Sequence, residues 1–222
     1  MRLFKLKTAL ICIALAMGVG AAGVQAATDT QGSSKSSKTA HSSKTTKSSK
    51  TSKPAKSSKK PSKPTGQKVS MLGGKFVFYL PKDYVQGPME EIDDKAKAAG
   101  VTGSLYMNKP AKRVVIITET PLPDGKSVPS NDTQTLDTII AETLVQQQSS
   151  YKDFTKLGEK KIVRKGLGLR QLDISGSVEG GKVLSTTIAA ASGTRTAMVN
   201  VISLAKDAKA HGVLVKGVTG SK

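Results

Sequence analysis

The stretch TKLGEKKIVRKGLGLRQLDISGSVEGGKVLSTTIAAASGTRTAMVNVISL, residues 155–204, decides the fold predicted for this chain. Its apolar and β-branched residues fall into four segments, 155–164, 167–178, 182–191 and 194–204. The segments are separated by Gly166, by Glu179-Gly180-Gly181 and by Ser192-Gly193. Because glycine accepts the positive φ angles of tight hairpin turns, this pattern predicts a meander of antiparallel strands.

More strands are predicted upstream of the meander. Residues 69–72 and 75–80 are short apolar segments on either side of Gly73-Gly74, which predicts a tight turn between two strands. Residues 103–107 and 112–118 predict two further strands. The second contains an unbroken apolar run, which is typical of a central strand covered on both faces.

The clearest predicted helix spans residues 131–150. Asn131 is the expected cap, and Leu136, Ile139 and Ile140 recur at helical spacing, so this stripe should cover one face of the sheet. Weaker helices are predicted at residues 89–99, which begin with acidic side chains, and at residues 207–216. Runs of strands with few helices predict an α+β fold, a twisted antiparallel sheet flanked by helices.

Residues 1–26 have the pattern of an export signal. Arg2, Lys5 and Lys7 precede an apolar stretch, and the small residues around Ala26 predict cleavage after it. An uncleaved anchor helix is the alternative, although the apolar run falls short of the roughly 20 residues that span a bilayer. Cys12, the single cysteine, lies in this stretch after Ile11 and does not fit a lipoprotein signal.

Residues 27–68 predict a disordered tether, because they are almost entirely Lys, Ser, Thr and Pro and have little apolar surface to bury. Its lysines largely keep a three-residue register, and we expect them to bind an anionic membrane or wall polymer. A soluble spacer is an equal alternative. The expected surface-binding residues are Lys35, Lys38, Lys44, Lys47, Lys50, Lys53, Lys56, Lys59, Lys60 and Lys63.

The formal charge of +19 is concentrated at the N-terminal side of the chain. The signal carries three cations and the tether eleven lysines against Asp29, which leaves +6 for residues 69–222. The predicted domain is therefore only mildly basic. A nucleic-acid partner is not expected, because export would separate the lysines from DNA.

The sequence predicts no enzyme. His41 lies in the tether and His211 in the weak last helix, so no Ser-His-Asp or Cys-His arrangement is expected. No GxSxG, HExxH or phosphate-binding glycine loop is present, and we expect no cofactor. Glu119, Asp124 and Asp173 would form a carboxylate site only if the fold brought them together.

An acidic group at residues 90–94 is the one candidate cation site. Calcium loops alternate their oxygen ligands and place a glycine at the sharp turn, and this group has neither feature. A solvated helix face is the usual meaning of such a cluster, so we expect no metal site.

Three segments together resemble the DcrB family of envelope proteins: residues 69–81, the strand 114–118, and Arg170-Gln171-Leu172-Asp173 with the hairpins after it. The resemblance implies a Mog1/PsbP-like fold and a periplasmic role in envelope upkeep, with some members linked to phage adsorption. It implies no catalytic residues. Two features depart from the family, which often has a lipoprotein signal and usually has a longer, more apolar last helix.

Two functions follow as expectations. The first is a non-catalytic binding or interaction protein of the cell envelope, in which the tether engages anionic surfaces and the domain at residues 69–222 engages an unidentified protein partner. The alternative is a chaperone-like holdase for apolar protein segments. The holdase requires an exposed apolar groove on the sheet face opposite the helix at residues 131–150.

Overall fold

A computed structural model describes residues 66–221 of the chain. The predicted signal at residues 1–26 and all ten tether lysines named above lie outside the described residues. The first strand, β1 (Gln67–Met71), begins two residues before the predicted domain boundary at Val69. Within residues 66–221, no helix is both long enough and apolar enough to cross a membrane.

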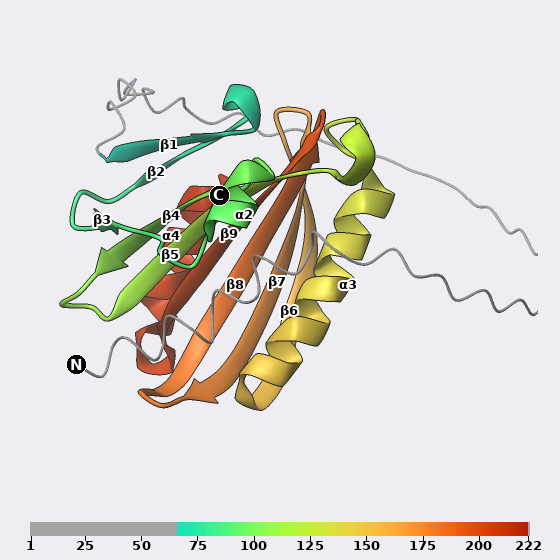
Figure 1. The fold of residues 1–222 in the computed structure, drawn as a ribbon. Coiled ribbons are helices and arrows are strands. Elements are labelled where there is room, and N and C mark those ends of the chain that lie inside the picture. The colour runs from blue at the N-terminus through green and yellow to red at the C-terminus, as the bar shows by residue number, and fades with distance from the viewer. Residues whose placement is uncertain (1–65, 222) are drawn as a thin grey trace, which may run out of the picture. The chain divides into compact units, whose positions relative to one another are not determined.

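An antiparallel sheet of seven strands in the order β3-β4-β5-β9-β8-β7-β6 organises the described part of the chain (Figure 1). The predicted meander is confirmed, because β6, β7, β8 and β9 pair in sequence order. The sheet strands are β3 (Val85–Gly87), β4 (Thr102–Asn108), β5 (Arg113–Pro121), β6 (Lys152–Arg164), β7 (Leu167–Val178), β8 (Gly181–Ser192) and β9 (Arg195–Leu204).

The hairpin predicted around Gly73-Gly74 is also confirmed. Strand β1 pairs with β2 (Phe76–Leu80) in a separate two-stranded sheet, and Gly73 in the turn has a φ of 63°. Such a φ is in the left-handed region that glycine adopts without a steric penalty. The three-residue edge strand β3 was not predicted, because Val85-Gln86-Gly87 has no apolar alternation to mark it.

Helix α3 (Thr133–Ser150) has the predicted apolar stripe, and Leu136, Ile139 and Ile140 are buried. Its N-cap is Asp132, one residue after the predicted Asn131. The Asp132 carboxylate accepts a hydrogen bond of 2.9 Å from the backbone N–H of Thr135, which is the geometry of a capping side chain.

Helix α2 (Asp94–Ala98) is shorter than the helix predicted over residues 89–99. Asp93 takes the N-cap position and its carboxylate accepts a 2.7 Å hydrogen bond from the Ala96 N–H. An N-cap residue has non-helical dihedral angles, so Glu90 and Glu91 precede the helix. Helix α4 (Ala208–Thr219) instead continues three residues past the predicted end at Lys216.

The two helices α3 and α4 pack on opposite faces of the sheet (Figure 1). On the α3 face, the core includes Ile139, Ile140, Leu172, Ile174 and Met198. On the α4 face, side chains of α4 and of the β1–β2 hairpin form the core with Leu169, Ile188, Val199 and Val201. Strand β5 is covered on both faces, as predicted, since Val115 and Ile116 are both buried on opposite sides.

The sheet face opposite α3 is therefore occupied rather than open. Phe76, Phe78 and Leu80 of β2 and Leu214 and Val218 of α4 are buried against it. The exposed apolar groove that the holdase requires was expected on this face, and in the described residues that location is wrong. The apolar hollow of the sheet lies on the α3 side instead.

Candidate functional site

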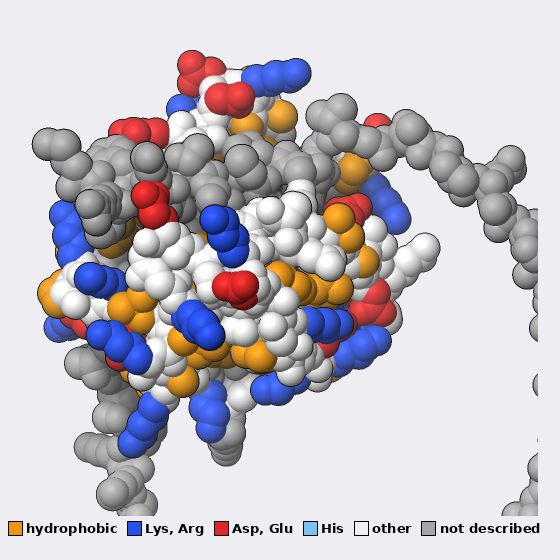
Figure 2. Space-filling model, turned by 90° about the horizontal axis from the view of Figure 1, so that it is seen from below, with side chains coloured by type: hydrophobic (Ala, Val, Ile, Leu, Met, Phe, Trp, Pro, Cys, Tyr) orange, Lys and Arg blue, Asp and Glu red, His pale blue; other side chains and the backbone are white. Residues whose placement is uncertain are grey.

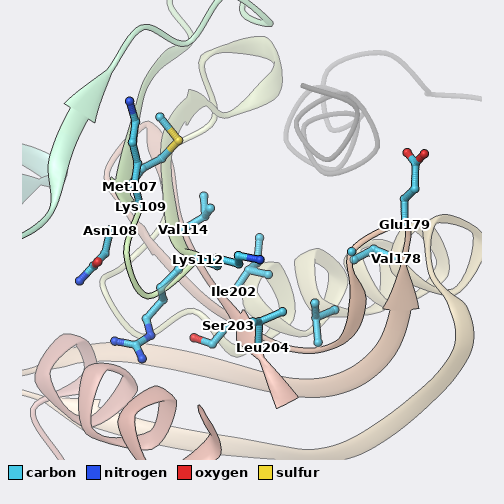
Figure 3. A pocket seen from close by; sticks show the side chains of 13 residues that line it. Met107, Asn108, Lys109, Lys112, Val114, Val178, Glu179, Ile202, Ser203 and Leu204 are labelled. Atoms are coloured by element: carbon cyan, nitrogen blue, oxygen red, sulfur yellow. The ribbon is translucent and has the colours of Figure 1, made fainter. Parts of the chain in front are cut away.

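A cavity with a volume of about 290 Å³ lies at one end of the sheet. Its floor is the end of β9, and its two sides are the β4–β5 hairpin and the β7–β8 hairpin (Figure 3). This arrangement follows from the strand order, because β9 lies between β5 and β8 and ends between the two turns. Its apolar lining consists of Met107, Val114, Val178, Val183, Ile202 and Leu204.

The cavity belongs to the α3 face of the sheet. Side chains alternate between faces along a strand, and Ile202 and Leu204 are two residues apart on β9. Val114 and Val183 belong to the same core cluster as Ile202, which places them on the same face. The apolar part of the lining is aliphatic apart from the Met107 thioether, and none of the lining residues is aromatic.

A tight turn fixes the polar side of the cavity. The Asn108 carboxamide oxygen accepts a 3.1 Å hydrogen bond from the Ala111 N–H, and the Asn108 amide group donates to the carboxylate of Asp83. The Lys112 N–H donates to the Lys109 carbonyl oxygen at 3.1 Å, and Lys112 has a left-handed φ of 49°. The turn therefore holds Lys109 and Lys112 at defined positions on the rim.

Positive charge predominates at the mouth. Lys109 and Lys112, both on the β4–β5 hairpin, line the cavity and are exposed. Glu179, on the β7–β8 turn, is the acidic side chain among the lining residues. Figure 3 shows the Lys112 side chain extending inward over the apolar floor, and Figure 2 shows lysine and arginine side chains around apolar patches on this end of the molecule.

A buried polar network lies on the other side of β9. The His211 Nδ1 atom is 3.0 Å from the Ser203 hydroxyl, and its Nε2 atom is 2.9 Å from the Thr186 hydroxyl. Thr186 in turn donates to the Asp173 carboxylate at 2.6 Å, and the Gln171 amide donates to the same carboxylate. Desolvation lowers the pKa of His211 to about 4, against the smaller opposing effect of Asp173.

This network ties α4 to the sheet and does not have the geometry of a catalytic triad. A catalytic triad needs a carboxylate that is hydrogen-bonded to the imidazole and a hydroxyl group that substrate can reach. Here Thr186 separates Asp173 from His211, and Ser203 is 1% exposed. The Ser203 hydroxyl also points toward α4, away from the cavity (Figure 3). From the sequence, His211 is expected in a weak helix, and its burial is not predicted.

The three carboxylates considered as a possible site are not brought together. Glu119 pairs with Arg195 at 2.9 Å, and Asp173 belongs to the His211 network. Asp124 is exposed in the short helical turn at Pro123–Gly125. Glu119 and Asp173 lie on strands β5 and β7, which are separated by β9 and β8, so their carboxylates cannot share one substrate atom.

A second polar cluster lies at the opposite end of the sheet. The Lys75 ammonium donates to Ser192 at 2.7 Å and lies 3.3 Å from Ser130, while the two serine hydroxyls are 2.8 Å apart. Lys75 is exposed, so its ammonium is hydrated, unlike the buried lysines that act as bases. The cluster joins β2, the loop before α3 and the β8–β9 turn.

In the segment from residue 66 to residue 221, no group of three or more His, Cys, Asp or Glu side chains is placed to hold a metal ion. The acidic group at residues 90–94 is divided between different roles. Asp93 caps α2, and Asp94 pairs with Lys97 at 3.2 Å.

Only one side of the cavity, the β4–β5 hairpin, has residues whose sequence predicts a turn there. Asn108-Lys109-Pro110 joins the two strands predicted at residues 103–107 and 112–118. The other half was hidden, because no local pattern shows that the β4–β5 and β7–β8 turns come to lie on either side of the end of β9.

Comparison with known proteins identifies the fold. No protein-family model and no curated protein matches this chain. The solution structure of cyanobacterial PsbP (CyanoP) from Synechocystis sp. PCC 6803 is similar, with a TM-score of 0.50 at 9% identity over 70% of this chain and 89% of that one.

Two further solved structures are more distant. A protein of unknown function from Pseudomonas aeruginosa has a TM-score of 0.41 at 13% identity and covers 63% of this chain and 95% of its own. A mutant of the protein Mog1 has a TM-score of 0.40 at 11% identity, covering 70% of this chain and 86% of that one. The likeness to PsbP confirms the predicted α+β fold, and residues 66–221 form a PsbP-like antiparallel sheet with helices on both faces.

Proposed function

We propose that this chain is an exported, non-enzymatic binding protein of the bacterial cell envelope. The observation that carries the proposal is the aliphatic cavity between the two hairpins, with lysines at its mouth. A concave apolar site with a few polar groups at its edge is the usual form of a binding site. The export pattern at residues 1–26 supports the envelope as the place where binding occurs.

The Lys/Ser tether gives the protein a second means of attachment. Lysines near an anionic membrane surface contribute about 1 kcal/mol each before salt screening. The ten lysines between residues 35 and 63 would then hold the domain at an anionic membrane or wall polymer without a lipid anchor. The folded domain, with a net charge of +6, adds a weaker attraction of the same sign.

The finer assignment to DcrB-like proteins is part of the same proposal. It is supported by the motifs at residues 69–81 and 170–173, which form the β1–β2 hairpin and the buried centre of β7. A DcrB-like protein would serve envelope upkeep and, in some cases, phage adsorption. The engagement of a protein partner by the folded domain also belongs to this proposal.

Sedimentation with lipid vesicles tests the tether. Mature protein beginning at Ala27 should co-sediment with vesicles rich in phosphatidylglycerol and not with pure phosphatidylcholine vesicles. Raising the salt from about 50 mM to about 500 mM should release it, because the Debye length falls well below 10 Å. Protein lacking residues 27–65, which leaves strand β1 intact, should stay in the supernatant while it remains folded.

A tether of the same length, with each lysine replaced by glutamine, separates charge from spacing. If attachment depends on charge, this variant behaves like the deletion. If the lysine-free variant still sediments with anionic vesicles as wild type does, the tether is a spacer and this part of the proposal is wrong.

A further inference from the structure

We propose that the cavity between the β4–β5 and β7–β8 hairpins binds a single aliphatic chain that ends in an anionic head group. The inference rests on the proposed function, because it names the ligand class of the same cavity. The hydrocarbon chain lies on the floor formed by Ile202 and Leu204, and the head group lies beside Lys112.

The lining selects for an aliphatic ligand. Val114, Val178, Val183 and Ile202 present branched methyl groups from the four strands β5, β7, β8 and β9, and Met107 adds a flexible thioether. Planar ring ligands usually stack on aromatic side chains, and none of the lining residues is aromatic. Methionine and aliphatic walls adapt to a flexible hydrocarbon chain.

The fold opposes an extended peptide as occupant. Peptides commonly bind by adding a strand to an exposed sheet edge. The floor of this cavity is β9, a central strand that is paired with β5 on one side and β8 on the other. Its backbone hydrogen bonds are already made, so a peptide would gain only side-chain contacts.

Charge places the head group at one end of the cavity. Lys112 extends over the apolar floor and Lys109 is exposed beside it, whereas Glu179 lies on the facing turn. An anion beside Lys112 is attracted by both lysines and stays away from the Glu179 carboxylate. Asn108 does not compete as a ligand group, because its amide is engaged by Asp83 and Ala111.

The volume of about 290 Å³ limits the occupant to one short chain. Ligand pockets for small molecules begin at about 300 Å³, so two acyl chains would not fit. A free fatty acid and a single-chain phospholipid both fit this description. Both carry one aliphatic chain and an anionic head.

Calorimetric titration of the full chain with dodecanoate, below its micellar concentration, tests the inference. Saturable binding with one site is expected, and 1-dodecanol should bind more weakly because it lacks the charge. A single-chain lysophosphatidic acid in place of dodecanoate identifies which head group, carboxylate or phosphate, is preferred. Absence of saturable binding by both anions would overturn the inference.

Two substitutions assign the site. Val178→Trp should fill the cavity and abolish binding of dodecanoate and dodecanol alike. Lys112→Glu should weaken the binding of dodecanoate by about threefold to tenfold, because it replaces an exposed ion pair with a repulsion between like charges. The affinity for dodecanol should not change. Lys95→Glu is the matched control, because Lys95 is exposed on α2 and does not line the cavity.

The ligand-binding experiments and the vesicle experiments can fail separately. Lys112 is exposed in a turn, so Lys112→Glu tests the head group even if Val178→Trp fails to fold. If Lys112→Glu and Lys95→Glu bind dodecanoate with equal affinity, the anionic head group is wrong. If vesicle attachment through the tether persists while dodecanoate does not bind, the inference fails and the envelope role stands.

Discussion

At the scale of single residues, His211 shows how a helix with little intrinsic stability is fixed to the sheet. The single proton of the Thr186 hydroxyl is donated to Asp173, so Thr186 must accept from the Nε2–H of His211. The Nδ1 atom then accepts from the Ser203 hydroxyl. The network therefore favours one neutral tautomer of a side chain that is 6% exposed.

This network predicts a loss of stability in mild acid. The folded-state pKa of His211 is lowered from 6.5 to about 4 by desolvation, with Asp173 raising it and Arg113 lowering it to smaller extents. Between these two values the unfolded chain binds more protons, so the free energy of unfolding falls as the pH falls from about 6.5 to 4. The loss is on the order of 3 kcal/mol at most. Urea midpoints measured across this range check it.

The control is His211→Gln, which cannot be protonated. It should be less stable than wild type at pH 7 and should have a flatter profile between pH 6.5 and 4. An equal slope in both proteins would show that His211 does not set the acid sensitivity. Asp137, whose pKa is held low by the Arg170 guanidinium, contributes only below this window, because its stabilisation is lost as the pH falls through its own lowered pKa.

Asp137 and Arg170 predict a further residue-scale effect. Arg170 is buried on β7 and donates a 2.6 Å hydrogen bond to the half-exposed Asp137 carboxylate on α3. Removing the carboxylate leaves a buried cation unpaired, which is more costly than removing both partners. Asp137→Ala should lower the thermal midpoint, and the double variant with Arg170→Met should recover part of the loss. A double variant less stable than Asp137→Ala would contradict this.

At the scale of elements, α4 depends on packing against the sheet more than on the helix propensity of its residues. Gly217 is exposed inside the helix, and a Cβ added there meets no atom within 4 Å. Gly217→Ala should therefore stabilise the protein by about 1 kcal/mol, measured by urea unfolding. Gly220 is the contrasting position, because it ends the helix with a φ of 71° and an added Cβ would approach Arg164 Nε at 2.8 Å. Gly220→Ala should destabilise, and a stabilising effect would contradict the assigned cap.

Strand β6 forms one edge of the seven-stranded sheet, and its lysines oppose pairing of this edge with another molecule. Val163 and Leu157 are exposed there, at 74% and 56%, and Lys156, Lys160 and Lys161 are exposed on the same strand. Charged side chains on an edge strand oppose pairing with a second molecule. Replacing Lys156 and Lys160 by threonine should produce concentration-dependent self-association in analytical ultracentrifugation. The same replacements at Lys95 and Lys97 on α2 should leave the sedimentation coefficient unchanged.

The elements that the sequence predicted well are those with a strong local signal. The β8 and β9 strands and the Leu136, Ile139 and Ile140 stripe were predictable because periodicity and glycine turns mark them. The cap at Asp132 was missed by one residue, since Asn131 has equal capping propensity. The burial of His211 was not predictable, because it depends on Thr186 and Ser203 from two other strands.

At the scale of the whole molecule, charge and structure are distributed differently along the chain. Most of the +19 lies before residue 69, whereas residues 66–221 have a mixed surface and include a cavity with a basic mouth. This division suits a protein that stays near an anionic surface through its tether and binds a ligand through its domain. It also explains why composition alone predicted the tether's partner and not the cavity, which is built from distant hairpins.

The mass of the protein recovered from fractionated cells shows whether the chain is exported, and the lysine array meets envelope polymers only if the chain leaves the cytosol. We expect the extracytoplasmic fraction to contain a polypeptide that begins at Ala27. Full-length protein that still begins at Met1 and is dissolved in the cytosol would contradict it.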